Sequence, residues 1–177
     1  MHILSKSQLE ELPEYHYDKV ILCSLITPRD DKYTVFPKKI LQFTNLKYLN
    51  LENNNIESLP ENINLLTNLK ELFLGNNCLT ELPECISSME NLILINAGIN
   101  YLQRLPANIK NIKFFYTYEE SFADLNNLPN DTIYLPLFYF AGQLNNLPIS
   151  IKEIILYYPK IPINIKLPYG CKIIIIN

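Results

Sequence analysis

The sequence predicts an α/β solenoid in which about seven or eight short parallel strands form one curved sheet, wound with a right-handed sense. The first observation is an apolar residue followed by proline, which recurs at eight regularly spaced positions. Its intervals are 24, 23, 23, 23, 23, 19 and 20 residues. The second observation is a pair of apolar residues one position apart in each unit, as in Leu49-Asn50-Leu51 and Leu72-Phe73-Leu74. Because side chains alternate between the faces of a strand, such a pair predicts a short strand with one buried face.

The front half of the chain repeats a longer pattern around these pairs. One unit reads Leu46-x-x-Leu49-x-Leu51-x-x-Asn54-x-Ile56-x-x-Leu59-Pro60-x-x-Ile63, and similar units begin at Leu69 and Leu92. The pattern resembles the leucine-rich-repeat family, which implies a solenoid with a parallel sheet on its concave side. The asparagine of each unit (Asn54, Asn77 and Asn100) is expected to point inward, because an amide can both donate to and accept from the backbone of a turn. We expect short helical turns on the convex side of these units.

The back half has shorter units, in which the strand pair follows sooner after the proline. The predicted buried pairs are Ile112/Phe114, Leu135/Leu137, Ile154/Leu156 and Ile174/Ile176. The segment Leu147-Pro148-Ile149-Ser150-Ile151-Lys152 resembles the FNIP type of repeat, and these units are also similar to the short repeats of bacterial effector proteins. Since fewer residues are left for the outer side, we expect irregular or 3₁₀ structure there from about residue 106 onward.

The beginning of the chain fits a cap on the array. Ser7 and Glu10 have the spacing of a capping box, which predicts a short helix before the first repeat. The first strand is expected from Val20 to Leu25. The domain prediction is therefore an N-terminal cap over residues 1–19 and a single repeat array over residues 20–177.

Composition excludes several function classes. A net charge of −3 disfavours nucleic acid as a partner, and no apolar run approaches the length of a membrane span. The two histidines and four cysteines have no metal-ligand or C-x-x-C spacing, so we expect no metal, no cofactor and no catalytic residues. The absence of a secretory signal and of paired cysteines predicts a cytoplasmic protein.

The open, concave face of the sheet is the candidate binding surface. Strand alternation predicts that it carries many aromatic side chains, which protein-binding surfaces enrich. The competing interpretation is that these rings pack on one another and stabilise the sheet. The predicted protein-binding residues are Tyr48, Asn50, Phe73, Asn96, Lys113, Phe115, Tyr116, Tyr134, Phe138, Tyr139, Ile155, Tyr157 and Tyr158.

We therefore expect a non-catalytic scaffold that recognises a protein partner. Abundant isoleucine and asparagine are typical of A+T-rich coding, so a viral source, with a host protein in the host cytoplasm as partner, is a further expectation. One alternative is self-assembly as a homodimer through the isoleucine-rich last strand, with Ile173 and Ile175 at the dimer edge. Another is a substrate-recognition subunit of a ubiquitin-ligase-type complex.

Overall fold

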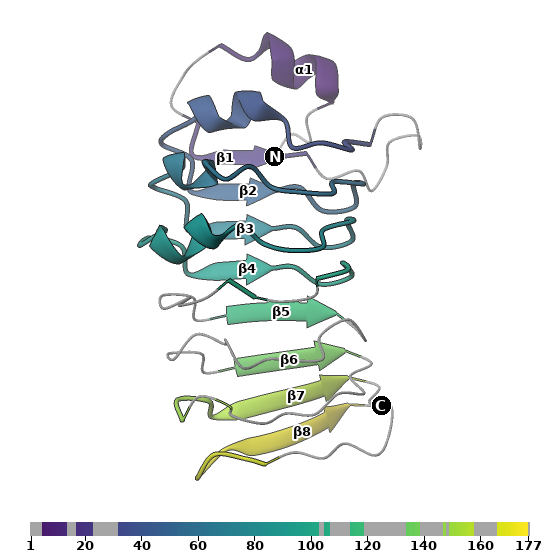
Figure 1. Ribbon diagram of the computed structural model, residues 1–177, viewed down its shortest axis with the longest axis vertical. Helices are drawn as coiled ribbons and strands as arrows, with labels where there is room; N and C mark the ends of the chain where they lie inside the picture. The colour runs from purple at the N-terminus through teal and green to yellow at the C-terminus, as the bar shows by residue number, and fades with distance from the viewer. Residues whose placement is uncertain are drawn as a thin grey trace.

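Eight parallel strands follow one another in a single sheet, and each strand pairs with its neighbours in chain order (Figure 1). The computed structural model describes residues 5–13, 17–22, 32–102, 105–106, 114–118, 134–138, 147, 149–157 and 166–176. The strands are β1 (Lys19–Ile21), β2 (Tyr48–Asn50), β3 (Glu71–Phe73), β4 (Leu94–Asn96), β5 (Phe114–Tyr118), β6 (Tyr134–Phe138), β7 (Glu153–Tyr157) and β8 (Lys172–Ile176). The parallel-strand solenoid predicted from the repeat is confirmed.

The core runs along one face of this sheet. The strand pairs Leu49/Leu51 and Leu72/Leu74 are fully buried, and they lie in register with one another across β2 and β3. Apolar burial of this kind contributes roughly 25 cal/mol per Å² of surface removed from water. Because each pair packs mainly on the units next to it, stability is distributed along the array.

Buried asparagines join each unit to its neighbours. The Asn77 amide nitrogen donates to the carbonyls of Leu51 and Leu74, both at 2.9 Å. Its amide oxygen accepts the backbone N–H of Ile56 at 3.0 Å. Asn54 and Asn100 repeat this geometry one unit earlier and one unit later. The inward asparagine ladder predicted from the sequence is confirmed.

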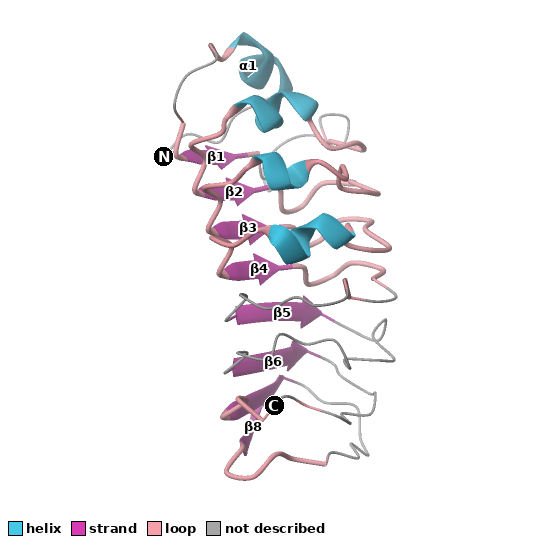
Figure 2. Cartoon of the chain, turned by 60° about the vertical axis from the view of Figure 1, so that its left-hand side comes forward, coloured by secondary structure: helices cyan, strands magenta, loops and turns pink. Residues whose placement is uncertain are grey.

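The side of the front units away from the sheet carries 3₁₀-helices, stacked above one another in Figure 2. They are η2 (Lys38–Gln42), η3 (Ile63–Leu65) and η4 (Glu84–Ser88). Each turn buries one isoleucine of the repeat, namely Ile40, Ile63 or Ile86. The predicted helical turns are thus short 3₁₀ segments. The corresponding prediction of irregular or 3₁₀ structure behind β5–β8 falls largely outside the described residues.

The cap differs in detail from its prediction. The helix α1 (Lys6–Glu11) begins after Ser5, whose hydroxyl accepts the N–H of Gln8 while the Gln8 side chain accepts the Ser5 N–H. The capping box is therefore Ser5/Gln8 and not Ser7/Glu10. The two pairs overlap in sequence and have the same spacing, so spacing alone did not distinguish them. Strand β1 covers Lys19–Ile21, so it begins one residue before the predicted Val20, and residues 23–25 of the prediction lie outside the described residues.

The register of β5 corrects the predicted pair Ile112/Phe114. Phe114 pairs with Leu94, and Phe115 pairs with Ile95, which is fully buried. Phe115 therefore occupies the register position of the buried residues, and Ile112 lies outside the described residues. In a parallel sheet, a shift of one residue exchanges the two faces of a strand.

The last strand is shifted in the same way. Ile173 pairs with Ile154, and Ile175 pairs with Leu156. Ile154 and Leu156 are both buried. The predicted buried pair Ile174/Ile176 was wrong, because these residues continue the columns of the open face. The predicted pairs Leu135/Leu137 and Ile154/Leu156 share one register, and Ile154 and Leu156 are buried as expected.

Candidate functional site

The open face of the sheet is the surface opposite the buried leucine pairs. In the front half its alternate strand residues are polar or only partly buried, apart from Ile21, which is 6% exposed. Two columns run across the strands: the first contains Lys19, Tyr48, Glu71 and Leu94, and the second contains Ile21, Asn50, Phe73 and Asn96. The predicted site residues Tyr48, Asn50, Phe73 and Asn96 therefore lie on one face, as expected.

Two aromatic rings of this face contact each other. The ring centroids of Tyr48 and Phe73 are 5.0 Å apart, and the rings are tilted by 36°. The Lys19 ammonium lies over the Tyr48 ring, 4.0 Å from its centroid. Contacts of these kinds fix the positions of the rings and contribute about 0.5–1.5 kcal/mol each. The rings thus form a small ordered platform that packs on itself and remains partly exposed on the open face.

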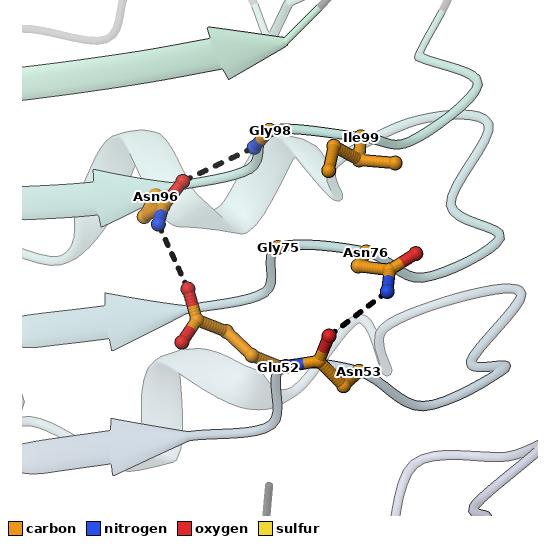
Figure 3. A pocket seen from close by; sticks show the side chains of 7 residues that line it. All are labelled: Glu52, Asn53, Gly75, Asn76, Asn96, Gly98 and Ile99. Atoms are coloured by element: carbon orange, nitrogen blue, oxygen red, sulfur yellow. Dashed lines mark hydrogen bonds between the residues drawn. The ribbon is translucent and has the colours of Figure 1, made fainter. Parts of the chain in front are cut away.

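A network of amides and one carboxylate lies beside this platform, where β2–β4 end. The Glu52 carboxylate accepts from the Asn50 amide at 3.1 Å and from the Asn96 amide at 2.8 Å. The second bond reaches across the intervening unit, as Figure 3 shows. It can do so because the unit between them has Gly75, where a Cβ atom would lie 3.0 Å from a Glu52 carboxylate oxygen.

The same strand ends enclose a pocket of about 330 Å³. Its lining consists of four carboxylate or amide side chains from the network and the turns, two glycines and one isoleucine: Glu52, Asn53, Asn76, Asn96, Gly75, Gly98 and Ile99 (Figure 3). Among the described residues that line it, Glu52 is the only charged one. The pocket opens on the face that carries Phe73 and Asn96.

Three turn residues in this region have a left-handed backbone. Asn53, Asn76 and Ile99 have φ values of 61°, 55° and 51°. Asparagine tolerates this conformation, whereas a β-branched residue strongly disfavours it. Ile99 is nevertheless 44% exposed at the edge of the pocket, so burial in the core does not explain an isoleucine at this position.

The back half contributes the predicted site residues by register. Tyr116 pairs with Asn96 and so continues the second column of the open face. Tyr134 pairs with Phe114 and Glu153, and these residues continue the first column. Ile155 lies in the column of Tyr116. Phe138 pairs with Tyr157 on one side and with Tyr118 on the other, so these two predicted residues share one row of the open face. The prediction that Phe115 lies on the open face was wrong, because Phe115 pairs with the buried Ile95. Tyr118 occupies the position assigned to Phe115, and Lys113, Tyr139 and Tyr158 lie outside the described residues.

The described parts of the chain show few other groups that could bind a metal or act as a nucleophile. They contain no group of three or more metal-ligating side chains. Burial raises the pKa of the Cys85 and Cys171 thiols, which disfavours the nucleophilic thiolate. Within the same residues, no helix is long and apolar enough to cross a bilayer.

The predicted site list contains Asn96 but none of the other residues that line the pocket. Nothing in the spacing pattern indicated that Glu52 would reach Asn96. The usable signal was Ile99, which stands where the two preceding units have Asn53 and Asn76. A departure from the repeat at a turn position marks a local role.

Comparison with known proteins supports the repeat assignment. Residues 44–84 match a family model described as leucine-rich repeats in two copies. No curated protein sequence is significantly similar to the chain. The matched region lies in the front half, so the FNIP-type resemblance of the back half remains a prediction.

Solved structures share the fold. A leucine-rich-repeat protein of Leptospira interrogans superposes with a TM-score of 0.59 at 23% identity, over 82% of this chain and 46% of that one. An internalin (inlF) of Listeria monocytogenes gives a TM-score of 0.55 at 18% identity, over 89% of this chain and 51% of that one. The chain thus spans about half the length of these two proteins. The predicted leucine-rich-repeat architecture is confirmed.

Proposed function

We propose that this leucine-rich-repeat chain is a non-catalytic scaffold that binds a protein partner through the open face of its sheet. Leucine-rich repeats and other solenoids typically present an extended surface for protein partners. The observation that carries the proposal is the ordered platform of Tyr48 and Phe73, which lies beside an open pocket on that face. Aromatic residues that are held in place before binding lose little conformational freedom when a partner covers them.

The test compares variants on the two sides of the array. Phe73→Ala removes one ring of the platform, and Leu65→Ala is the matched control, because Leu65 is 51% exposed on η3 away from the sheet. Proteins captured by the immobilised wild-type chain are identified by mass spectrometry, and the melting temperature of each variant is measured in the same buffer. The scaffold proposal expects a captured protein that Phe73→Ala loses and Leu65→Ala keeps.

Two results would argue against this function. Equal capture by all three proteins would show that the open face is not used. A large fall in the melting temperature of Phe73→Ala, with loss of capture only where the variant is unfolded, would assign the ring a structural role. The expectations of a host protein as partner and of a cytoplasmic location depend on composition and remain predictions.

A second candidate function is self-association through β8. Ile175 is 57% exposed although it continues the column of Leu156, which is almost fully buried, and Ile174 and Ile176 are also exposed. A strand at the end of a sheet can pair with another chain. The register corrects the assigned roles, because Ile173 and Ile175 extend the core columns and Ile174 and Ile176 extend the open face. Both pairs are therefore candidate contacts of the homodimer.

Sedimentation velocity of the whole chain tests this candidate. Ile175→Lys should convert a dimer into a monomer, and Ile149→Lys is a control, since Ile149 is 88% exposed and is not part of β8. A wild-type chain that stays monomeric at high micromolar concentration would exclude the dimer.

A further inference from the structure

We propose that the pocket at the ends of β2–β4 receives an arginine side chain of the protein partner. The inference builds on the proposed function, because it assigns a chemistry to one part of the binding face. The pocket volume of about 330 Å³ is near the lower end of ligand sites, which suits one long side chain. The occupant follows from the charge, shape and backbone of the lining residues.

The charge argument starts from Glu52. Its carboxylate is held by the Asn50 and Asn96 amides, and both of these donors are neutral. The described residues show no lysine or arginine in an ion pair with Glu52. Since an ionised carboxylate can accept about four hydrogen bonds, it retains capacity for a donor that enters the pocket. The geometry therefore presents a fixed negative charge to a cationic group.

The shape of the pocket favours arginine over lysine. Gly98 contributes no side chain to the lining, so a flat group can approach its backbone, while the Glu52 carboxylate and the Asn96 amide lie over Gly75. The exposed side chain of Ile99 provides an apolar wall for an aliphatic stem. A guanidinium is planar and binds a carboxylate through two parallel hydrogen bonds, whereas an ammonium acts as a point charge.

The backbone of Ile99 is a separate observation. A β-branched residue holds a left-handed conformation at this edge of the pocket, where the two preceding units have asparagine. Strain of this kind is found preferentially at binding and catalytic sites. In this pocket it adds an apolar surface to the same lining as the fixed carboxylate, which is the combination that an arginine side chain contacts.

The test is a titration of the full-length, ¹⁵N-labelled chain with N-acetyl-argininamide, followed by NMR. Saturable shifts are expected at the backbone amides of Gly75 and Gly98 and at the Asn96 side-chain amide. N-acetyl-citrullinamide, which has nearly the same shape without the charge, should bind at least tenfold more weakly. N-acetyl-lysinamide should bind more weakly than the arginine probe.

Variants locate the effect. Glu52→Gln keeps an oxygen for the Asn96 amide but removes the charge, and it should weaken arginine binding about tenfold. Glu71→Gln is the matched control, because Glu71 lies on the same face outside the pocket and should leave binding unchanged. Gly75→Ala keeps the charge but adds a Cβ 3.0 Å from the carboxylate oxygen, so it should also weaken binding. Amide dispersion in the same spectra checks that each variant is folded.

The proposal is overturned if the arginine and citrulline probes bind equally, or if folded Glu52→Gln and Gly75→Ala both bind like wild type. This outcome is separable from failure of the proposed function. If the probe does not bind while Phe73→Ala still loses its captured protein, the scaffold stands and the arginine pocket falls. If the probe binds but open-face variants capture the same proteins as wild type, the pocket stands and the scaffold falls.

Discussion

Replacement of Asn77 by alanine should destabilise the fold more than any exposed asparagine substitution. Asn77 is only 5% exposed, and it bonds the carbonyls of Leu51 and Leu74 and the N–H of Ile56. In the variant, the Leu51 carbonyl keeps its bond from Asn54, and the Leu74 carbonyl keeps its bond from Asn100. The Ile56 N–H has no such second partner among the described residues, so it becomes a buried, unsatisfied donor.

The size of the effect follows from these contacts. An unsatisfied buried N–H costs about 1–3 kcal/mol, and each lost hydrogen bond to a carbonyl costs about 0.5–1.5 kcal/mol. We therefore expect Asn77→Ala to lower the free energy of unfolding by about 3 kcal/mol.

Urea denaturation monitored by circular dichroism measures this difference, and hydrogen exchange at the Ile56 amide checks its origin. Exchange at Ile56 should accelerate more than exchange at core amides two units away. The control is Asn64→Ala, because Asn64 is exposed and its side chain bonds only Ser88 among the described residues, at 3.3 Å. It should change stability by less than about 0.5 kcal/mol. An Asn77→Ala stability within that same margin would refute the reasoning about the ladder.

Three other substitutions or conditions test separate parts of the structure. Leu72→Ala leaves a cavity at a fully buried position and should cost roughly 2–5 kcal/mol in urea denaturation, whereas Leu65→Ala on the exposed side should cost far less. Asn76 has a φ of 55°, so Asn76→Ala should be about 1 kcal/mol less stable than Asn76→Gly, and equal stabilities would contradict the left-handed backbone. Burial raises the pKa of Cys85, so its thiolate fraction at pH 8 should be smaller and its alkylation by iodoacetamide slower than that of free cysteine, as followed by mass spectrometry. The Cys85 rate should increase at higher pH than the free-cysteine rate, and coincident pH profiles would contradict the burial of this thiol.

The sequence predicted the front half well because polar and apolar residues alternate there without ambiguity. In Tyr48-Leu49-Asn50-Leu51, only one choice of faces puts both leucines inside, and the structure has that choice. Likewise, Glu153 marks the open face of β7 and leaves Ile154 and Leu156 for the core.

The register of β5 and β8 could not be predicted in this way. Phe114-Phe115-Tyr116-Thr117-Tyr118 has aromatic residues in both frames, and Ile173–Ile176 has isoleucine in both, so alternation favours neither face. In the structure, pairing with β4 and β7 decides the register.

The pocket depends on a contact that no local pattern contains. Glu52 and Asn96 are 44 positions apart, and they meet because Gly75 leaves space between them. Such a bond follows from three-dimensional stacking, whereas sequence spacing alone gave only the face on which both residues lie.

The spacing of the asparagine bonds makes whole units of the array interchangeable. Asn77 reaches a carbonyl 26 positions back and an N–H 21 positions back, and Asn100 does the same. Excision of the 23 residues from 70 to 92 would bring Asn100 to the Leu51 carbonyl and the Ile56 N–H. The shortened array could therefore form the same hydrogen bonds at the new junction. The bond between Glu52 and Asn96 would not survive, because it spans two units. The number of repeat units can therefore change while the asparagine ladder is kept, but a gain or loss of one unit at this point removes the arginine pocket.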